Sequence, residues 1–260
     1  MPLRLPDVAR LTRRRERDAR GLFLVEGVRS VEAAVQAGAT LAEVLVTAEA
    51  AATPRVDVLL RRAACPVREV AARELSKVSE VETAQGVVAL AGIPPSPDLR
   101  TARRVLALDG VQDPGNVGTL VRTAAWFGLD AVVAGPGTAD FFSPKVVRSA
   151  MGGLWDVGLA RTDDLAATLG TLKQQGRTLY GAALDGVAAH AWRPEGPGVL
   201  VLGSEAHGLS SAAAALLDVA VTIPGATGRR GTESLNVAVA GGVLLYAWGK
   251  SEIGNRKSQK

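Results

Sequence analysis

Four polar residues lie close together late in the chain: Thr232, Glu233, Ser234 and Asn236. They follow a glycine-rich loop and open an almost wholly apolar segment that ends near Tyr246. A segment that is apolar on every side predicts a buried helix, and polar groups at a buried helix start cost free energy unless they have partners. A helix cap explains Ser234, and the helix dipole explains Glu233. Neither explains Asn236, which this pattern places inside the first turn, so we interpret the junction as part of a site.

Two further loops carry polar residues directly after an apolar stretch. One runs from Asp113 through Asn116 and leads to Arg122, one turn into the next predicted helix. The other covers residues 203–210 and contains Glu205. The loop before the four late polar residues adds three glycines, a composition typical of backbone that bends sharply or lies close to a ligand. They are Gly225, Gly228 and Gly231.

Short apolar stretches alternate with segments of helical spacing, which predicts an α/β protein. In the second half we expect strands at 105–109, 131–134, 157–160, 178–183 and 199–203, with helices between them. Continuous apolar strands separated by helices indicate a parallel sheet, and ligands bind at the carboxyl ends of such strands. The three polar loops are therefore expected to gather at one edge of the sheet, where together they form a candidate site.

The first half has its own alternation of strands and helices over residues 21–93 and ends at a proline-rich stretch. We predict a stiff linker at 94–102, a second domain at 103–250 and a basic tail at 251–260. A basic arm at 1–20 comes first, with seven arginines against three acids. Basic ends on a nearly balanced body suit phosphate contacts, and a solvated, frayed terminus is the alternative interpretation.

The composition disfavours several classes of protein. The single Cys65 allows no internal disulfide, and the two histidines without a cysteine cluster predict no metal site. The amino terminus is arginine-rich rather than apolar, and no apolar run is long enough to span a bilayer, so we expect a soluble, cytoplasmic protein with no membrane partner. The glycine patterns of dinucleotide and nucleoside triphosphate sites are missing, which disfavours enzymes of those classes.

Taken in order, the three loops resemble the motifs of the SpoU (TrmH-type) branch of the SPOUT RNA methyltransferases. The resemblance lies in residues 113–122, 202–210 and 223–246. Residues 23–31 and 83–88 are more loosely similar to the family's ribosomal-protein-like substrate-binding domain. Together the two resemblances cover nearly the whole chain.

The resemblance implies a fold, a cofactor and a reaction. The implied fold is α/β: a C-terminal SPOUT domain with a parallel sheet and a deep trefoil knot, and a small N-terminal α/β RNA-binding domain. The implied reaction is methyl transfer from S-adenosylmethionine to a ribose 2′-hydroxyl of RNA by a homodimer. The implied cofactor-binding residues are Leu202, Gly203, Ser204, Ile223, Pro224, Leu235 and Asn236.

The resemblance also implies the catalytic residues Arg122, Asn116, Glu205, Ser234 and Asn236. A ribose hydroxyl is a weak acid, so it needs a base or a strong hydrogen-bond partner. Because arginine stays protonated in proteins, we expect Arg122 to clamp an RNA phosphate beside the hydroxyl rather than to take its proton. Glu205 would orient Arg122, and Asn116 would hold Arg122 or the ribose. Ser234 and Asn236 would complete a polar wall.

The resemblance of the first domain favours ribosomal RNA as the methylation target. The sequence leaves three alternatives open. The target is transfer RNA, or the methyl group goes to a base, or the fold serves an RNA-binding protein without turnover. RNA-binding residues are expected in the basic arm, at Arg13, Arg14 and Arg15, in addition to Arg122. The arm's contribution to affinity would be independent of RNA sequence and would weaken with salt.

Overall fold

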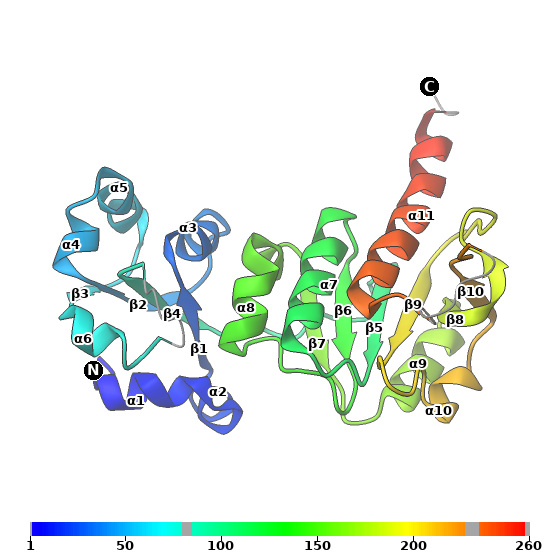
Figure 1. The fold of residues 1–260 in the computed structure, drawn as a ribbon, viewed down its shortest axis with the longest axis horizontal. Coiled ribbons are helices and arrows are strands. Elements are labelled where there is room, and N and C mark those ends of the chain that lie inside the picture. The colour runs from blue at the N-terminus through cyan, green and yellow to red at the C-terminus, as the bar shows by residue number, and fades with distance from the viewer. Residues whose placement is uncertain (1, 80–84, 227–233, 258–260) are drawn as a thin grey trace. The chain divides into compact units, whose positions relative to one another are not determined.

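A computed structural model of the chain describes residues 2–79, 85–226 and 234–257, with side chains as far as residue 249. The chain divides into two compact units (Figure 1). Met1–Pro95 and Asp140–Asp156 form the first unit, and Ser96–Ala139 and Val157–Lys260 form the second. The boundary after Pro95 falls inside the stretch for which we predicted a linker. The segment Asp140–Asp156 differs from the prediction, because we placed it in the second domain and it packs with the first unit.

The described part of the first unit is a four-stranded mixed sheet with helices on both faces. The strand order is β1-β4-β2-β3, in which β4 runs antiparallel to β1 and β2, and β3 runs parallel to β2. The elements are α1 (Leu5–Ala9), η1 (Arg10–Thr12), α2 (Arg14–Arg20), β1 (Leu22–Glu26), α3 (Val28–Gln36), β2 (Leu41–Val46), α4 (Ala48–Ala51), α5 (Pro54–Arg62), β3 (Val67–Glu69), α6 (Ala72–Leu75), β4 (Val87–Gly92), α8 (Pro144–Ala150) and η2 (Met151–Trp155).

The arginine-rich start of the chain, for which we predicted a basic arm at 1–20, folds as part of this unit. Val8 and Leu11 are completely buried in the core on one face of the sheet. Arg17 is buried as well and forms an ion pair with Asp140, 2.5 Å from Nη2 to Oδ2. Its Nη1 donates to the carbonyl oxygen of Leu11. Burial of apolar side chains and a paired charge fixes this segment, as a solvated arm would not be fixed.

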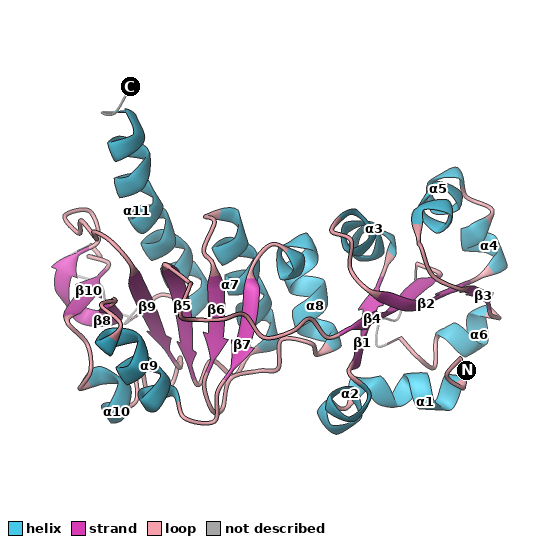
Figure 2. Ribbon diagram, turned by 180° about the vertical axis from the view of Figure 1, so that it is seen from behind, coloured by secondary structure: helices cyan, strands magenta, loops and turns pink. Residues whose placement is uncertain are grey.

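The described part of the second unit is a six-stranded sheet in the order β10-β8-β9-β5-β6-β7, with every neighbouring pair parallel. The predicted parallel α/β sheet is confirmed. Helices α7 and α11 cover one face, and α9 and α10 cover the other (Figures 1 and 2). The elements are β5 (Arg104–Asp109), α7 (Pro114–Trp126), β6 (Ala131–Ala134), β7 (Gly158–Arg161), α9 (Leu165–Gln174), β8 (Thr178–Ala188), β9 (Gly198–Gly203), α10 (Ser211–Ala214), β10 (Val219–Thr222) and α11 (Val237–Lys257).

Close packing sets α11 directly on α7 and β9. At Gly241, an added Cβ atom would lie 2.4 Å from Cδ2 of Leu120 and 2.8 Å from Cδ1 of Leu202. A side chain at this position would force the buried side chains of Leu120 and Leu202 to move, so glycine lets the helix lie this close without repacking them. The packing brings the start of α11 beside the start of α7.

Two details of α11 differ from the sequence-based expectation. The helix begins at Val237, after Asn236 rather than at Ser234. It also has an exposed apolar face, since Val239 and Tyr246 are 53% and 57% exposed, so the prediction of a helix buried on every side is wrong. Among the described residues, no helix is both long enough and apolar enough to cross a membrane.

Candidate functional site

The polar loops follow the carboxyl ends of parallel strands. Strand β5 ends at Asp109 and β9 ends at Gly203, and these residues pair in register. The carboxylate of Asp109 accepts a hydrogen bond from the main-chain N–H of Ser210, 2.7 Å from N to Oδ2. Asp109 therefore holds the loop after β9 against the end of β5. We had not predicted this role, although an acid at the end of an apolar strand is a signal for it.

The loop after β9 folds back on itself at once. Ser204 and Gly208 exchange two main-chain hydrogen bonds of 2.9 Å each. At Gly203 an added Cβ atom would lie 2.1 Å from the carbonyl carbon of Gly208, so only glycine fits. The main-chain N–H of His207 donates to Oγ of Ser204, which gives this histidine a local structural position. The tight turn leaves Glu205 exposed at its tip.

The first turn of α7 is fixed by its cap. Oδ1 of Asp113 accepts a hydrogen bond from the main-chain N–H of Asn116 at 2.9 Å, and Pro114 occupies the first helical position. Both features are typical of helix starts. The cap holds the half-exposed Asn116 at the beginning of α7, and Arg122 lies further along the same helix with its side chain exposed.

Asn236 caps α11. Its Oδ1 accepts hydrogen bonds from the main-chain N–H groups of Ala238 and Val239, at 2.9 and 3.3 Å. The prediction that Asn236 lies inside the first turn is wrong, and Ser234 is an exposed residue in a bend before the helix. Thr232 and Glu233 lie outside the described residues, as do Gly228 and Gly231.

Three side chains from these separate elements form one hydrogen-bonded chain. Nδ2 of Asn236 donates to Oδ1 of Asn116 at 3.1 Å, and Nδ2 of Asn116 donates to Oε1 of Glu205 at 2.5 Å. The sequence prediction that Asn116, Glu205 and Asn236 come together thus has a direct structural counterpart. We predicted that Glu205 orients Arg122; in the described part of the chain the hydrogen bond of Glu205 is with Asn116.

This chain of side chains is partly open to solvent, and its geometry suits binding of a polar ligand. Each asparagine presents a donor and an acceptor, and the carboxylate accepts only. Since the three groups hold one another in place, they are preorganised for a hydroxyl-bearing partner rather than free to rotate. The exposed cation of Arg122 lies on the helix that carries Asn116 and can attract an anion.

The candidate cofactor residues lie at the ends of two strands. Leu202 and Gly203 end β9, with the Leu202 side chain buried, so the main chain is the part of Leu202 available to a ligand. Ile223 and Pro224 follow β10, which lies on the far side of β8 from β9. Leu235, just before α11, is 46% exposed.

The arginines predicted to bind RNA in the amino-terminal segment lie on the first unit. Arg13, Arg14 and Arg15 are exposed there. Arg14 makes a surface ion pair with Asp18 in α2, 3.4 Å from Nε to Oδ2. All three remain accessible to a phosphate, because exposed pairs of this kind are weak.

Two protein-family models match the chain. The model described as the SpoU rRNA Methylase family matches residues 103–246. The model described as the MRM3-like substrate binding domain matches residues 4–89. The second match includes most of the arginine-rich segment, in agreement with its position in the folded first unit.

Similar proteins with names or solved structures cover almost the full length of the chain. The 23S rRNA (guanosine(2553)-2'-O)-methyltransferase RlmP of Bacillus subtilis is 36% identical over 244 residues, 94% of each chain. The SpoU methyltransferase AviRb of Streptomyces viridochromogenes, solved with AdoMet, has a TM-score of 0.86 at 27% identity and covers 97% of this chain and 99% of its own. The AdoMet-bound rRNA methyltransferase of Sinorhizobium meliloti has a TM-score of 0.83 at 26% identity, with 96% and 94% covered.

Proposed function

The chain belongs to the SpoU rRNA methylase family, and from this premise we propose that it transfers the methyl group of S-adenosylmethionine to a ribose 2′-hydroxyl of ribosomal RNA. The hydrogen-bonded chain of Asn236, Asn116 and Glu205 at the carboxyl edge of the sheet carries this proposal. A ribosomal RNA substrate also implies a cytoplasmic location.

The hydrogen-bonded side chains of Asn236, Asn116 and Glu205 position the ribose. Asn116 and Asn236 offer donors and acceptors to the ribose hydroxyls, and their mutual hydrogen bonds keep them in place. The ribose oxygen would bond to the methyl carbon as that carbon leaves the cofactor's sulfur, and the hydroxyl proton would pass to water at this solvent-open site, so negative charge would develop on the ribose oxygen. Arg122 binds the neighbouring RNA phosphate, and its fixed positive charge stabilises that developing charge. Ser234, exposed before the cap of α11, adds a hydroxyl to the same wall.

The chain's own residues fit S-adenosylmethionine, which supplies an activated methyl group when bound. Main-chain donors and acceptors end β9 at Leu202 and Gly203, where the glycine is required by the return of the loop. Ile223 is half-buried and Leu235 is half-exposed, so both offer apolar surface to an adenine ring. Ser204 and Pro224 complete these two segments.

The fold around the cofactor is proposed to contain the family's deep trefoil knot. Strand β10 lies at one edge of the sheet, yet the following helix α11 packs on β9 and α7 near its middle. The described segments before residue 227 and after residue 233 therefore lie at the edge and near the centre of the sheet, an arrangement that supports the proposed knot. The first unit is proposed to bind the RNA, with Arg13, Arg14 and Arg15 contacting phosphates in a salt-dependent way.

A methylation assay tests the reaction and its target. Purified protein and S-adenosylmethionine labelled on the methyl group are incubated separately with in vitro transcribed 23S rRNA, 16S rRNA and a transfer RNA pool. We expect label in ribosomal RNA, recovered after nuclease digestion as 2′-O-methylribose. Arg122→Ala and Asn236→Ala should each lower the rate about 100-fold, the size of effect typical of groups that stabilise developing charge.

Arg103→Ala is the matched control, because Arg103 is an exposed arginine next to the opposite, amino end of β5. Its rate should equal that of the wild type, and all variants should fold to the same melting temperature within a few degrees. Label in a base, or only in transfer RNA, would overturn the proposed target. Cofactor binding by calorimetry without transfer to any RNA would favour a binding protein on the same fold.

We further propose that a second copy of the chain covers the exposed apolar face of α11. Val239, Val243 and Tyr246 follow helical spacing on one side of this helix, and the ring of Tyr246 contacts Phe127 at the end of α7. Trp126, beside Phe127, is 83% exposed. Exposed apolar side chains on one helix face are typical of an interaction surface.

Light scattering after gel filtration tests the dimer. The wild type should have twice the 26.8 kDa mass of the chain, and Val243→Asp should reduce it to one chain. Val58→Asp is the control, since Val58 is a similarly exposed valine in the first unit. A wild type of single-chain mass at micromolar concentration would contradict this assembly.

A further inference from the structure

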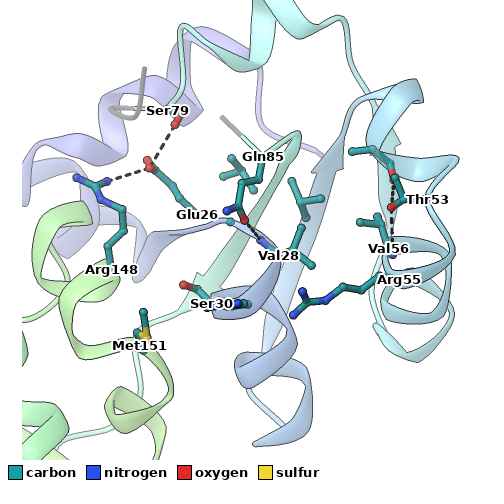
Figure 3. Close-up of a pocket in the computed structure, with 15 residues that line it drawn as sticks. Glu26, Val28, Ser30, Thr53, Arg55, Val56, Ser79, Gln85, Arg148 and Met151 are labelled. Atoms are coloured by element: carbon teal, nitrogen blue, oxygen red, sulfur yellow. Dashed lines mark hydrogen bonds and ion pairs between the residues drawn. The ribbon is translucent and has the colours of Figure 1, made fainter. Parts of the chain in front are cut away.

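The first unit contains a cavity of about 810 Å³ at the beginning of α3 (Figure 3). Its walls come from the end of β1, the start of α3, the start of α5 and the α8–η2 segment. A volume of this size lies in the range of small-ligand sites. None of Asn116, Glu205 and Asn236 lines this cavity, so the cavity is a separate site.

Positive charge dominates the wall. Three arginines line the cavity, Arg29, Arg55 and Arg148, and among the described lining residues Glu26 is the one acid. Glu26 is buried and accepts hydrogen bonds from Nη1 of Arg148 at 2.9 Å and from Oγ of Ser79 at 3.2 Å, as Figure 3 shows. Its charge is thus matched within the wall, and the excess that remains is positive.

Glu32, which does not line the cavity, forms an ion pair with one of these arginines, Arg55. Arg55 donates to both its carboxylate oxygens, at 2.7 and 2.5 Å. These hydrogen bonds lower the pKa of Glu32, and the nearby charge of Arg29 lowers it further. Three arginines against two glutamates still leave one positive charge, which we place at the exposed Arg29.

The start of α3 adds hydrogen-bond donors to this charge. Gly27 precedes the helix with φ of 88°, and the described structure contains no side-chain cap there. The N–H of Val28 is taken by Oε1 of Gln85 at 3.0 Å, which leaves the NH₂ group of Gln85 to donate. The N–H groups of Arg29 and Ser30 belong to the first turn and have no acceptor within the helix. Such a helix start attracts anions.

Apolar side chains also line the cavity, and one of them belongs to a residue with a strained main chain. They include Val28 from the start of α3, Val56 from α5 and Met151 from η2 (Figure 3). Met151 has φ of 48°, the one positive value among the non-glycine residues that the structure describes. Such a conformation costs on the order of 1–3 kcal/mol and points to a functional constraint. The thioether of Met151 thus contributes to the lining of a cavity with excess positive charge.

We propose that this cavity binds one unstacked nucleotide of the RNA, a role that rests on the proposed function of the protein. The phosphate lies at Arg29 and the first turn of α3. The base lies among the apolar side chains of Val28, Val56 and Met151. An unstacked base exposes its edges to side-chain hydrogen bonds, and Gln85 and Ser30 are placed to read them. A double helix does not enter a cavity of this size, so the ligand is an unpaired nucleotide.

Filter binding of in vitro transcribed 23S rRNA to the full chain tests this proposal without relying on turnover. Arg29→Ala removes the phosphate contact, and Ser30→Trp fills the cavity. Each should weaken RNA binding about tenfold. Arg29→Ala should also reduce the slope of log affinity against log salt by about one, whereas Ser30→Trp should leave the slope unchanged. In the wild-type complex, chemical probing should find one unpaired nucleotide protected that Ser30→Trp no longer protects.

Arg61→Ala is the matched control, because Arg61 is an exposed arginine of α5 outside the cavity. It should change the affinity less than twofold, and all variants should bind S-adenosylmethionine like the wild type. Wild-type affinity in both cavity variants, or equal losses in Arg61→Ala and Arg29→Ala, would overturn the inference even if methyl transfer proceeds. Conversely, a protein that fails to methylate but loses RNA affinity in the cavity variants would refute the proposed reaction and support the cavity.

Discussion

Three buried ion pairs of the first unit contrast with the exposed polar side chains of the candidate site in the second unit. In the first unit the ion pair of Arg17 and Asp140 is buried, with side chains 3% and 9% exposed. The carboxylates of Glu26 and Glu43 are buried there too, each against an arginine. In the second unit the linked side chains of Asn116, Glu205 and Asn236 all retain exposure to solvent.

This difference separates structural polar groups from groups that can act on a ligand. A buried charge cannot lose its partner without a large cost, so it is committed to the fold. A hydrogen-bonded side chain at the surface can exchange a partner for a ligand at little net cost, because water replaces whatever it gives up. The same residue types therefore have different consequences when they are changed.

Breaking the buried pair should have the largest effect. Arg17→Ala leaves the carboxylate of Asp140 buried without its main cation, and we expect unfolding free energy to fall by about 3–5 kcal/mol. Urea unfolding measures this. The control Arg14→Ala breaks the exposed pair with Asp18 and should cost under about 1 kcal/mol. Equal losses in the two variants would remove the distinction between buried and exposed pairs.

Removing the side-chain hydrogen bonds between Asn236, Asn116 and Glu205 should affect turnover more than stability. Asn116→Ala removes both of its side-chain hydrogen bonds, and methyl transfer to 23S rRNA should fall about 100-fold. The unfolding free energy should change by about 1 kcal/mol or less, because solvent replaces the lost partners. Steady-state kinetics and urea unfolding on the same preparation separate the two quantities. A variant that loses stability in proportion to activity would make Asn116 a structural residue.

The exposed pair of Glu32 and Arg55 should produce the smallest effect. The hydrogen bonds that Arg55 donates to Glu32 lower the pKa of Glu32 in the folded protein. The stability that these bonds add is therefore present above the ordinary pKa of a glutamate. That stability is lost as pH falls through the lowered value. Glu32→Gln should therefore shift the urea midpoint slightly downward at neutral pH and not at all in strong acid. A difference that grows in acid would contradict this assignment.

Most of the second unit could be predicted from the sequence, because its determinants are local. Continuous apolar strands between helices indicated the parallel sheet, and the sheet in turn predicted that the loops bearing Asn116, Glu205 and Asn236 meet at one edge. The exact role of Asn236 was not predictable, since the cap depends on where α11 begins. Packing at Gly241 sets that helix on α7 and β9.

The first unit was harder to predict, because long-range contacts define it. Seven arginines in residues 1–20 concealed the apolar spacing of Leu5, Val8 and Leu11, which gives this segment its buried face. Arg17 forms an ion pair with Asp140, far along the chain, and no local sequence pattern predicts such a pair. The cavity at α3 likewise needs Arg148 and Met151 from the same distant segment.

The placement of Asp140–Asp156 in the first unit means that the chain passes between the units three times, after Pro95, Ala139 and Asp156. A gene fragment starting at residue 96 would include Phe142 without Phe23, the ring it meets at a centroid distance of 4.9 Å. Its product would expose an apolar surface and tend to aggregate. Recombination between relatives at the linker would separate residues 140–156 from the rest of the first unit, so these residues would have to fit the new partner's residues 1–95. The two parts of the gene are therefore expected to be inherited together.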